Sequence, residues 1–579
     1  MPISSTFKLS LAHINDTHSH FEPTSVSLVI PEVNIKVCLD TGGFARIKNT
    51  VDSFRKQADE SDCPFLFLHA GDCFQGSLYY SLFKGEVNAR LLNLLGLDAM
   101  TLGNHELDLG NTPVAEFLDH IDFPLLAGNW DISNEDIGKS NRLTDKEKLQ
   151  PYSPNEKRAN IIYKDFGNTR VAIFGICIDK MAAIANPDDD TPFLDATTVV
   201  RNTVAYLHSK AIKHIILLSH LGYEADLEMA NAIEGLSVVI GGHSHTLQGD
   251  FSAFGWESEE PYGRIVSDTV VFQAGCHAMF SGLVELEFDD TGKVINHTGG
   301  NYLMIDTDFH ESMSIECEGR AENITDAKRI AKQYLEKQNR IILVNSSNEI
   351  SEILNNEYRP AVLEMTSDIV TQVPSRLRHV RIPDEDGGSC IAPLVCDAML
   401  YSARSRGNTI DFAIHNAGGV RVSVESGPLT AAEVAGRLLP FEIDIVKYKA
   451  TGSQFREALE GAINNATNNG VEGTGDGSYP YLADLKFDYD TCLPMGKRIT
   501  TLLFRQNNRW TPILGEIWYT AVSSAYTTKG KEGYDALNHR QNDSMSIGVT
   551  LSESFIEYAR TKFELVNVAD SECHLYHRQ

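Results

Sequence analysis

The chain has 579 residues, of which 42% are hydrophobic and 22% are charged, a composition typical of a globular protein with more than one domain. Its 79 acidic residues outnumber its 50 basic ones and give a formal net charge of −29, so nonspecific attraction to nucleic acid polymers is disfavoured. The sequence has no apolar run of 18 residues, and we therefore expect no transmembrane span.

The two ends of the sequence show no targeting signal. Residues 1–6 contain neither a basic segment nor a long apolar one, so we expect no signal peptide. No hydrophobic tail follows Val566, which argues against a lipid anchor. We expect a cytoplasmic protein, or a periplasmic or secreted one if a leader was trimmed. The ten cysteines are spread widely without a Cys-x-x-Cys pair, which favours reduced thiols over disulfides.

Five short apolar runs of β type each lead into a polar cluster. The runs cover residues 9–14, 65–68, 99–102, 215–218 and 238–240, and the clusters begin at Asp16, Gly71, Gly103, Ser219 and Gly241. Buried strands have this pattern, and the carboxyl ends of parallel strands meet at one edge of an α/β sheet. The sequence therefore predicts an α/β fold in which five segments bring Asp, His and Asn side chains together.

These side chains predict a site for two divalent metal ions. Carboxylate, imidazole and amide oxygen together suit Zn, Mn, Fe or Mg, and the ligands are too many for one tetrahedral ion. Taken singly, each would more often be a structural histidine or a turn or cap residue. We expect one ion on Asp16, His18 and His245, a second on Asn104, His220 and His243, and Asp72 as the bridge. Two such ions activate water for attack at phosphorus.

The motifs, in this order, resemble those of a known enzyme family. Asp-x-His, Gly-Asp, Gly-Asn-His-Glu, a strand-terminal His and Gly-His-x-His are similar to the calcineurin-like metallophosphoesterases. Within these the chain resembles the two-domain 5′-nucleotidases, which include UDP-sugar hydrolases, apyrases and cyclic-nucleotide phosphodiesterases. Residues 71–77 and 103–108 match the family's Gly-Asp-x-x-Gln-Gly-Ser and Gly-Asn-His-Glu-x-Asp segments. The resemblance implies a four-layer α/β/β/α metallophosphoesterase domain, joined by a helix to a C-terminal α/β substrate-binding domain, with two ions that are Zn, Mn, Mg or Co.

The resemblance also implies a catalytic pair. His105 would hydrogen-bond a phosphate oxygen and stabilise charge that develops in the transition state. Asp108 would orient and charge that imidazole; its alternative role is an acidic residue in the first turn of a helix. We interpret Glu106 as structural.

The domain boundary is expected after an alternating strand at 282–288 that ends in a hairpin turn at 289–292. Residues 325–337 have helical spacing with Thr325 as a plausible cap, and in the family a helix here links the domains. We therefore expect a metallophosphoesterase domain over 1–315, a linker helix region over 316–355 and a substrate-binding domain over 356–579.

A second set of motifs lies in the C-terminal half. Residues 416–421 resemble the family's Asn-Gly-Gly-x-Arg loop, in which glycines permit close approach to a ligand and arginine suits a phosphate or carboxylate. In relatives two aromatic rings sandwich the base, although either ring alone would more often be a core residue. Arg381 is preferred here over Arg376 and Arg378. The resemblance implies a substrate site made of Arg381, Asn416, Gly418, Gly419, Arg421, Phe441 and Tyr526.

Two segments depart from the family pattern. One covers residues 389–398, and in the other Lys531-Glu532 replaces Gly-Asp where the substrate pocket is expected.

We expect metal-dependent hydrolysis of nucleoside 5′-monophosphates to nucleoside and phosphate. The alternatives are a 2′,3′-cyclic-nucleotide phosphodiesterase with 3′-nucleotidase activity, a hydrolase of UDP-sugars or nucleotide diphosphates, and a nucleotide-binding signalling protein without turnover. The partner would be a small nucleotide, not a nucleic acid polymer, and the chain a monomer or homodimer.

Overall fold

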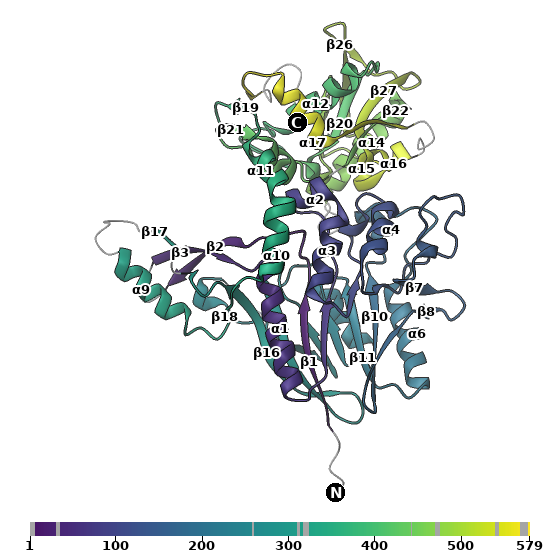
Figure 1. The fold of residues 1–579 in the computed structure, drawn as a ribbon. Helices are drawn as coiled ribbons and strands as arrows, with labels where there is room; N and C mark the ends of the chain where they lie inside the picture. The colour runs from purple at the N-terminus through teal and green to yellow at the C-terminus, as the bar shows by residue number, and fades with distance from the viewer. Residues whose placement is uncertain are drawn as a thin grey trace. The chain divides into compact units, whose positions relative to one another are not determined.

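The computed structural model of the chain contains two compact units, Met1–Arg359 and Pro360–Gln579 (Figure 1). The structure describes residues 6–30, 35–256, 260–309, 313–316, 324–441, 443–468, 475–538, 544–567 and 577–578. The domain and linker limits given above stay predictions.

Two sheets lie at the centre of the first unit. The larger sheet contains, in order, β17 (Ser314–Glu316), β3 (Ile35–Thr41), β16 (Val294–Ile305), β15 (Phe280–Phe288), β1 (Phe7–Ile14), β4 (Phe65–His69), β5 (Ala99–Thr101), β6 (Leu125–Ala127), β7 (Leu149–Ser153) and β8 (Arg158–Ala159), with β2 (Thr24–Ile30) beside β3 and β18 (Ile341–Leu343) beside β16. The smaller sheet contains β13 (Arg264–Val266), β14 (Thr269–Phe272), β12 (Val238–Ile240), β11 (His214–His220), β10 (Thr169–Cys177) and β9 (Ile162–Phe166).

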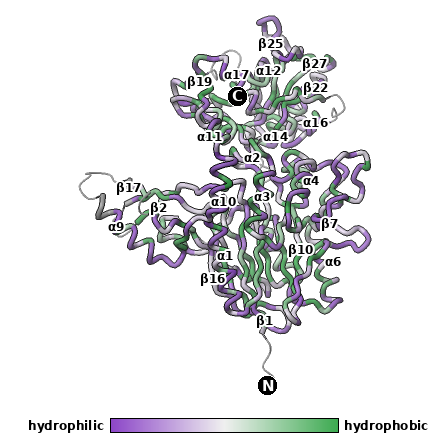
Figure 2. Tube along the Cα trace, viewed as in Figure 1, coloured by the Kyte–Doolittle hydropathy of each residue, from purple (hydrophilic) through white to green (hydrophobic). Residues whose placement is uncertain are grey.

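The two sheets share a hydrophobic core. Leu11 and Leu68 of the larger sheet belong to the same buried cluster as Leu218 and Ile240 of the smaller one. Helix α1 (Phe44–Glu60) contacts β1 and β4, and α3 (Gly85–Leu95) packs between α1 and α4 (Asn111–His120). On the other sheet, α6 (Ala196–Ser209) and α7 (Tyr223–Ala232) cover a second core. The unit therefore has the α/β/β/α layers that we expected, and the central strands are its most hydrophobic part (Figure 2).

All five predicted strands are present. Four of them end before their polar cluster, whereas Ser219 and His220 are the last residues of β11 itself. The expected strand at 282–288 is β15, and the turn to β16 is closed by the Asp289 N–H, which donates to Lys293 O at 2.9 Å. The hydrophobic pattern thus located the strands correctly to within two residues.

Helix α9 (Ile324–Leu335) confirms the helical spacing of the predicted linker helix. The helix includes Thr325, the expected cap, whose side chain lies outside the described residues. Ala331 and Leu335 are fully buried in a cluster with residues of β2 and β3, so α9 packs within the first unit. The chain passes from one unit to the other later, in the helical segment from α10 (Asn348–Ile353) to α11 (Arg359–Ser367) (Figure 1).

The second unit contains a five-stranded sheet with helices packed on it. The strands, in order, are β23 (Pro480–Ala483), β20 (Phe412–Asn416), β27 (Trp518–Ser524), β22 (Asp444–Thr451) and β28 (Met545–Thr550). Side chains of β20 share one core with those of the helices α12 (Ala392–Ser405), α14 (Gly452–Asn468) and α17 (Leu551–Arg560). Two smaller sheets are formed by β19 (Ile369–Val373) with β21 (Gly427–Thr430), and by β24 (Leu485–Tyr489), β25 (Ile499–Gln506), β26 (Arg509–Pro512) and β29 (His577–Arg578).

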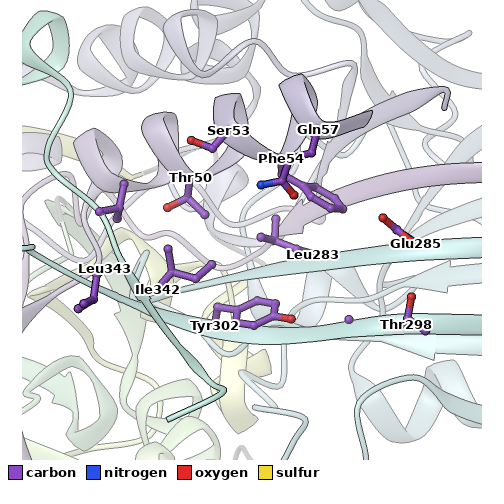
Figure 3. A pocket seen from close by; sticks show the side chains of 12 residues that line it. Thr50, Ser53, Phe54, Gln57, Leu283, Glu285, Thr298, Tyr302, Ile342 and Leu343 are labelled. Atoms are coloured by element: carbon purple, nitrogen blue, oxygen red, sulfur yellow. The ribbon is translucent and has the colours of Figure 1, made fainter. Parts of the chain in front are cut away.

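Helix α1 and the strands β15, β16 and β18 surround a cavity of about 600 Å³ (Figure 3). Phe54, Leu283 and Tyr302 line it together with small polar side chains, and Glu285 is the one carboxylate among the lining residues. None of the predicted metal ligands is among those residues. Among the described residues, no helix combines the length and hydrophobicity needed to span a membrane.

Candidate metal centre

The seven predicted metal ligands lie where strands of both sheets end. β1, β4 and β5 run parallel in one sheet, and β11 and β12 run parallel in the other, so their carboxyl ends point the same way within each sheet. Six of the seven form two groups, in each of which the candidate ligand atoms lie within 4.8 Å of one another. The groups are Asp16, His18 and His245, and Asp72, His220 and His243.

Asp72 belongs to the second group and also faces the first. Its Oδ2 is 3.1 Å from His220 Nε2 and 4.0 Å from His18 Nε2. Asn104, the seventh predicted ligand, is in the second group, because its Oδ1 is 2.9 Å from His243 Nδ1. The structure therefore brings all seven residues together, and the assignment of each residue to one cation or the other stays a prediction.

The backbone at these residues is strained. Five of the seven, Asp16, His18, Asp72, His243 and His245, have φ between 47° and 74°, a region that costs a non-glycine residue roughly 1–2 kcal/mol. Hydrogen bonds within the centre offset part of this cost. The backbone N–H of His243, for example, donates to both carboxylate oxygens of Asp16 at 3.0 Å. Such sharp turns after the strands direct neighbouring side chains into one small volume.

Backbone carbonyls fix the orientation of two imidazoles. His220 Nδ1 lies 2.7 Å from Ala70 O, and His18 Nδ1 lies 3.2 Å from Phe74 O. When Nδ1 of each ring is protonated and donates a hydrogen bond to the carbonyl, Nε2 presents a lone pair toward the carboxylates, as in metal-ligating histidines.

The donor atoms fit divalent cations. The buried His220 Nε2 lies 3.1 Å from Asp72 Oδ2, so this imidazole and this carboxylate can ligate one cation together. His18 Nε2 and His245 Nε2 are only 3.0 Å apart, a spacing that a shared cation suits. Burial lowers the pKa of His18 and of His243 to about 4. Against the effect of burial, Asp72 raises the pKa of His220 to about 9 and Asp16 raises that of His245 to about 10, so a bound cation would have to displace a proton from each of these two imidazoles. Burial alone would raise the pKa of Asp72, but His220 and His105 hold it well below its usual range.

Glu106 joins two of the ligand loops. Its buried carboxylate accepts hydrogen bonds from the backbone N–H groups of Asp72, Cys73, Phe74 and Gly103, at 2.6–3.1 Å. These bonds tie the loop after β4 to the loop after β5, which agrees with our structural interpretation of this residue.

His105 and Asp108 form a pair beside this centre. His105 Nδ1 is 2.7 Å from Asp108 Oδ2, and the backbone N–H of His105 donates to Asp72 Oδ1 at 2.9 Å. Burial alone would lower the pKa of His105, but Asp108 and Asp72 raise it to about 10, so the imidazole is positively charged at pH 7. The alternative role of Asp108 is wrong, because α4 begins three residues later, at Asn111, with Gly110 as its cap. The pair can therefore present a charged N–H donor to an anion.

Most candidate substrate residues of the second unit are linked by contacts. The Arg421 guanidinium lies 5.4 Å from the centroid of the Phe441 ring, and Asn416 Nδ2 donates to Glu532 Oε2 at 3.1 Å. Tyr526 lies in the short helix α15 (Ala525–Thr528), where the next residue, Thr527, donates to Asn416 Oδ1 at 3.4 Å.

The glycines of the loop at 416–421 have identifiable neighbours. A Cβ on Gly419 would lie 2.3 Å from Nε2 of the buried His415, and one on Gly418 would lie 3.3 Å from the Gly477 backbone. Gly419 is therefore required by packing inside the unit. Arg381 Nη1 donates to Asp476 Oδ1 at 2.7 Å, next to Gly477, whereas Arg376 pairs with Glu425. Of the arginines considered, Arg381 is thus connected to this loop.

Glu532 occupies an unusual position in this network. It has φ 53° and ψ 41°, a conformation that Glu adopts less readily than the Asp expected there. Burial raises the pKa of its carboxyl group to about 7, although Asn416, Arg381 and Arg421 all favour the charged form.

Comparison with known proteins supports both halves of this description. Residues 9–247 match the family model of the calcineurin-like phosphoesterases, and residues 369–539 match that of the 5′-nucleotidase C-terminal domain. The chain belongs to the two-domain 5′-nucleotidase family. It is 28% identical over 548 residues to a probable 5′-nucleotidase of Treponema pallidum, with 92% of this chain and 88% of the relative covered. It is also 28% identical to the NAD 5′-nucleotidase of Haemophilus influenzae, with 96% and 90% covered.

A solved structure agrees with this membership. The 5′-nucleotidase precursor from Thermus thermophilus superimposes with a TM-score of 0.69 at 26% identity and 99% coverage of both chains. The protein is therefore a metal-dependent phosphoric ester hydrolase of the nucleotide phosphoesterase type, which uses divalent metal ions.

Two further residues of this region were not predicted from the sequence. Cys276 and His277 follow β14, the parallel neighbour of β12, and their candidate ligand atoms lie within 4.8 Å of that of His245. The available signal was a sixth apolar run, residues 269–272, followed four residues later by a Cys-His pair.

We predict that Asp72→Ala loses divalent metal from both groups, because this carboxylate belongs to one group and faces the other. His105→Ala should keep nearly normal metal content while turnover falls by about two to three orders of magnitude, the effect of removing one charge-stabilising donor. Metal analysis by mass spectrometry beside steady-state kinetics measures both. The exposed His120→Ala, in the same domain, is the control, and undiminished turnover in His105→Ala would contradict the role given to His105.

We also predict a pH-dependent stability difference for Glu532→Gln. The folded-state pKa of about 7 exceeds the ordinary value of 4.5, so the protonated carboxyl is compatible with folding below pH 4.5, and stability is lost as the pH rises from there through 7. The variant should therefore be roughly 2–3 kcal/mol more stable than the wild type at pH 8 but similar at pH 4.5. Thermal unfolding from pH 4.5 to 8, with the exposed Glu385→Gln as control, measures this. A difference that does not change with pH would contradict it.

Proposed function

We propose that the protein hydrolyses nucleoside 5′-monophosphates to nucleoside and inorganic phosphate. The observation that carries this proposal is the pair of ligand groups around Asp72 with a charged His105 beside them. This arrangement suits hydrolysis at phosphorus, where negative charge on the phosphoryl oxygens must be stabilised and water must be activated.

The seven candidate ligands would hold two cations. Asp16, His18 and His245 would bind one, Asn104, His220 and His243 the other, and Asp72 would contact both. Such cations polarise phosphoryl oxygens and make hydroxide available near neutral pH. The donor set of carboxylate, imidazole and amide is compatible with Zn, Mn, Mg or Co.

His105 would act on the phosphate directly. Because the Nδ1–H of the charged His105 donates a hydrogen bond to Asp108, the other ring nitrogen carries the N–H that would donate to a phosphoryl oxygen. Asp108 would be a positioning residue, since it holds the imidazole in the charged state and fixes its orientation. As charge develops on the oxygen, this hydrogen bond strengthens, and the transition state gains more than the ground state.

The second unit would select the nucleotide. Arg421 and Arg381 would contact anionic or polar groups, Asn416, Gly418 and Gly419 would form the loop against the ligand, and Phe441 and Tyr526 would stack on the base. Support comes from Arg421, a guanidinium whose pKa is lowered by partial burial. A cation that is partly removed from water gains from an incoming anion.

The alternative reactions remain within phosphoric ester and anhydride hydrolysis. Curated relatives include 5′-nucleotidases, an NAD 5′-nucleotidase and an apyrase, so splitting of nucleotide anhydrides is the second candidate. A cyclic-nucleotide phosphodiesterase with 3′-nucleotidase activity is the third. A non-catalytic signalling role is disfavoured, because all seven candidate ligands and the His105–Asp108 pair are present together.

We predict that AMP or UMP is hydrolysed with the highest kcat/KM among AMP, UMP, ADP, UDP-glucose, NAD and 2′,3′-cyclic AMP, each assayed with Mn, Mg, Zn and Co. Release of phosphate and of nucleoside identifies the bond that is broken. Asp72→Ala serves as the inactive control. Failure of every compound to react with every metal would overturn the proposal, and preference for an anhydride or a cyclic phosphate would select the corresponding alternative.

We predict that Phe441→Ala and Tyr526→Ala each raise KM for nucleoside monophosphates by roughly 5- to 150-fold, because base–aromatic stacking contributes roughly 1–3 kcal/mol. Hydrolysis of p-nitrophenyl phosphate, which has no base, should be nearly unchanged. Steady-state kinetics on both substrates provides the comparison, and Phe563→Ala, an exposed phenylalanine of the same unit, is the control. Equal losses on the two substrates would show that these rings are structural.

A further inference from the structure

A second cluster of metal-binding side chains adjoins the metal centre. His245, Cys276 and His277 have candidate ligand atoms within 4.8 Å of one another. Neither Cys276 nor His277 belongs to the ligand groups assigned above, and His245 is shared with Asp16 and His18. Cys276 and His277 follow β14, and His245 follows β12, the parallel neighbour of β14 in the smaller sheet.

The loop that carries Cys276 and His277 is held on several sides. Asn15 Nδ2 donates to Gly275 O at 2.6 Å, and the His277 N–H donates to Asp16 O at 2.8 Å. The Gly43 N–H donates to Ala278 O at 3.0 Å. These bonds connect the loop to the end of β1 and to the start of α1, so its side chains are positioned before any ligand binds.

Backbone strain is also present in this loop. His277 has φ 57° and Ala278 has φ 54°, in the same left-handed region as five of the metal ligands. This backbone conformation places the His277 ring among other imidazoles, with centroid distances of 4.3 Å to His20 and 5.7 Å to both His18 and His245. Strain of this kind persists where the surrounding structure fixes a functional geometry.

We propose that Cys276, His277 and His245 form an accessory site for one thiophilic divalent cation such as Zn²⁺. A thiolate with two imidazoles is a donor set that Zn²⁺ and Cd²⁺ favour, whereas Mg²⁺ and Mn²⁺ favour oxygen ligands. The His245 side chain is 38% exposed, and Cys276 and His277 are half-buried, so an ion can reach them from solvent. Binding replaces the thiol proton of Cys276, which passes to solvent.

The shared ligand couples this site to the first ligand group. His245 Nε2 lies 3.5 Å from Asp16 Oδ1 and 3.0 Å from His18 Nε2. A cation that draws His245 toward Cys276 competes with a cation held by Asp16 and His18. Excess Zn²⁺ therefore weakens retention of the first ion. This inference goes beyond the proposed function, and it holds whatever phosphoric ester the enzyme hydrolyses.

Alkylation of the full-length protein tests the site. The enzyme is first saturated with Mn²⁺, then treated with iodoacetamide with or without added Zn²⁺, and each cysteine peptide is quantified by mass spectrometry. At a Zn²⁺ concentration ten times the dissociation constant, Cys276 should react about tenfold more slowly, because the bound thiolate is no longer the free nucleophile. The exposed Cys492 should react at the same rate in both samples. An unchanged rate at Cys276 would overturn the proposal.

Binding of Cd²⁺ to the Cys276 thiolate can be measured directly by ultraviolet absorption. Titration of the Mn²⁺-loaded protein should produce a thiolate-to-cadmium charge-transfer band in the ultraviolet that saturates at one ion per chain. Cys276→Ser should lose this band, Cys492→Ser should keep it, and His277→Ala should need at least about tenfold more Cd²⁺. A band of full height in Cys276→Ser, or none in the wild type, would overturn the proposal, and the wild-type result does not depend on the folding of any variant.

Discussion

The Asp72 carboxylate is the point on which the metal centre depends. One of its oxygens accepts a hydrogen bond from the backbone N–H of His105, and the other faces the imidazoles of His220 and His18. These groups come from three different strand ends and from both sheets. The backbone of Asp72 is in turn bound by Glu106, which also holds the loop after β5. A displacement of this one residue therefore alters both ligand groups and the His105–Asp108 pair.

This arrangement is costly without cations. Asp16 and Asp72 are buried carboxylates, and buried charges destabilise a fold unless they are paired and hydrogen-bonded. The positive φ at five ligands adds roughly 1–2 kcal/mol each. The large shared core between the two sheets offsets these costs. Because cations bind the folded site and its geometry is absent from the unfolded chain, metal binding should contribute directly to the stability of this unit.

The sequence was sufficient for the parts of the structure that follow from local pattern. Short apolar runs located the strands, and the rule that parallel strands end at one edge predicted which polar residues would meet. Asn416 and Glu532, by contrast, are 116 positions apart, and no local pattern shows that they form a hydrogen bond. Cys276 and His277 were overlooked because no recognised motif contains them. That Asp108 is not an acidic residue in the first turn of a helix became clear only from the start of α4 at Asn111.

Charge explains how a protein with a net charge of −29 can still favour a phosphate ester. The acidic excess acts over the whole surface and is screened within about 10 Å by salt, whereas a single cationic group acts at short range on an anion beside it. His105 supplies positive charge beside the metal centre, and Arg381 and Arg421 supply it in the second unit, where both act on Glu532. Burial raises the pKa of Glu532 to about 7, so its charge changes near neutral pH, and the neutral form leaves more of the positive charge of Arg381 and Arg421 uncompensated.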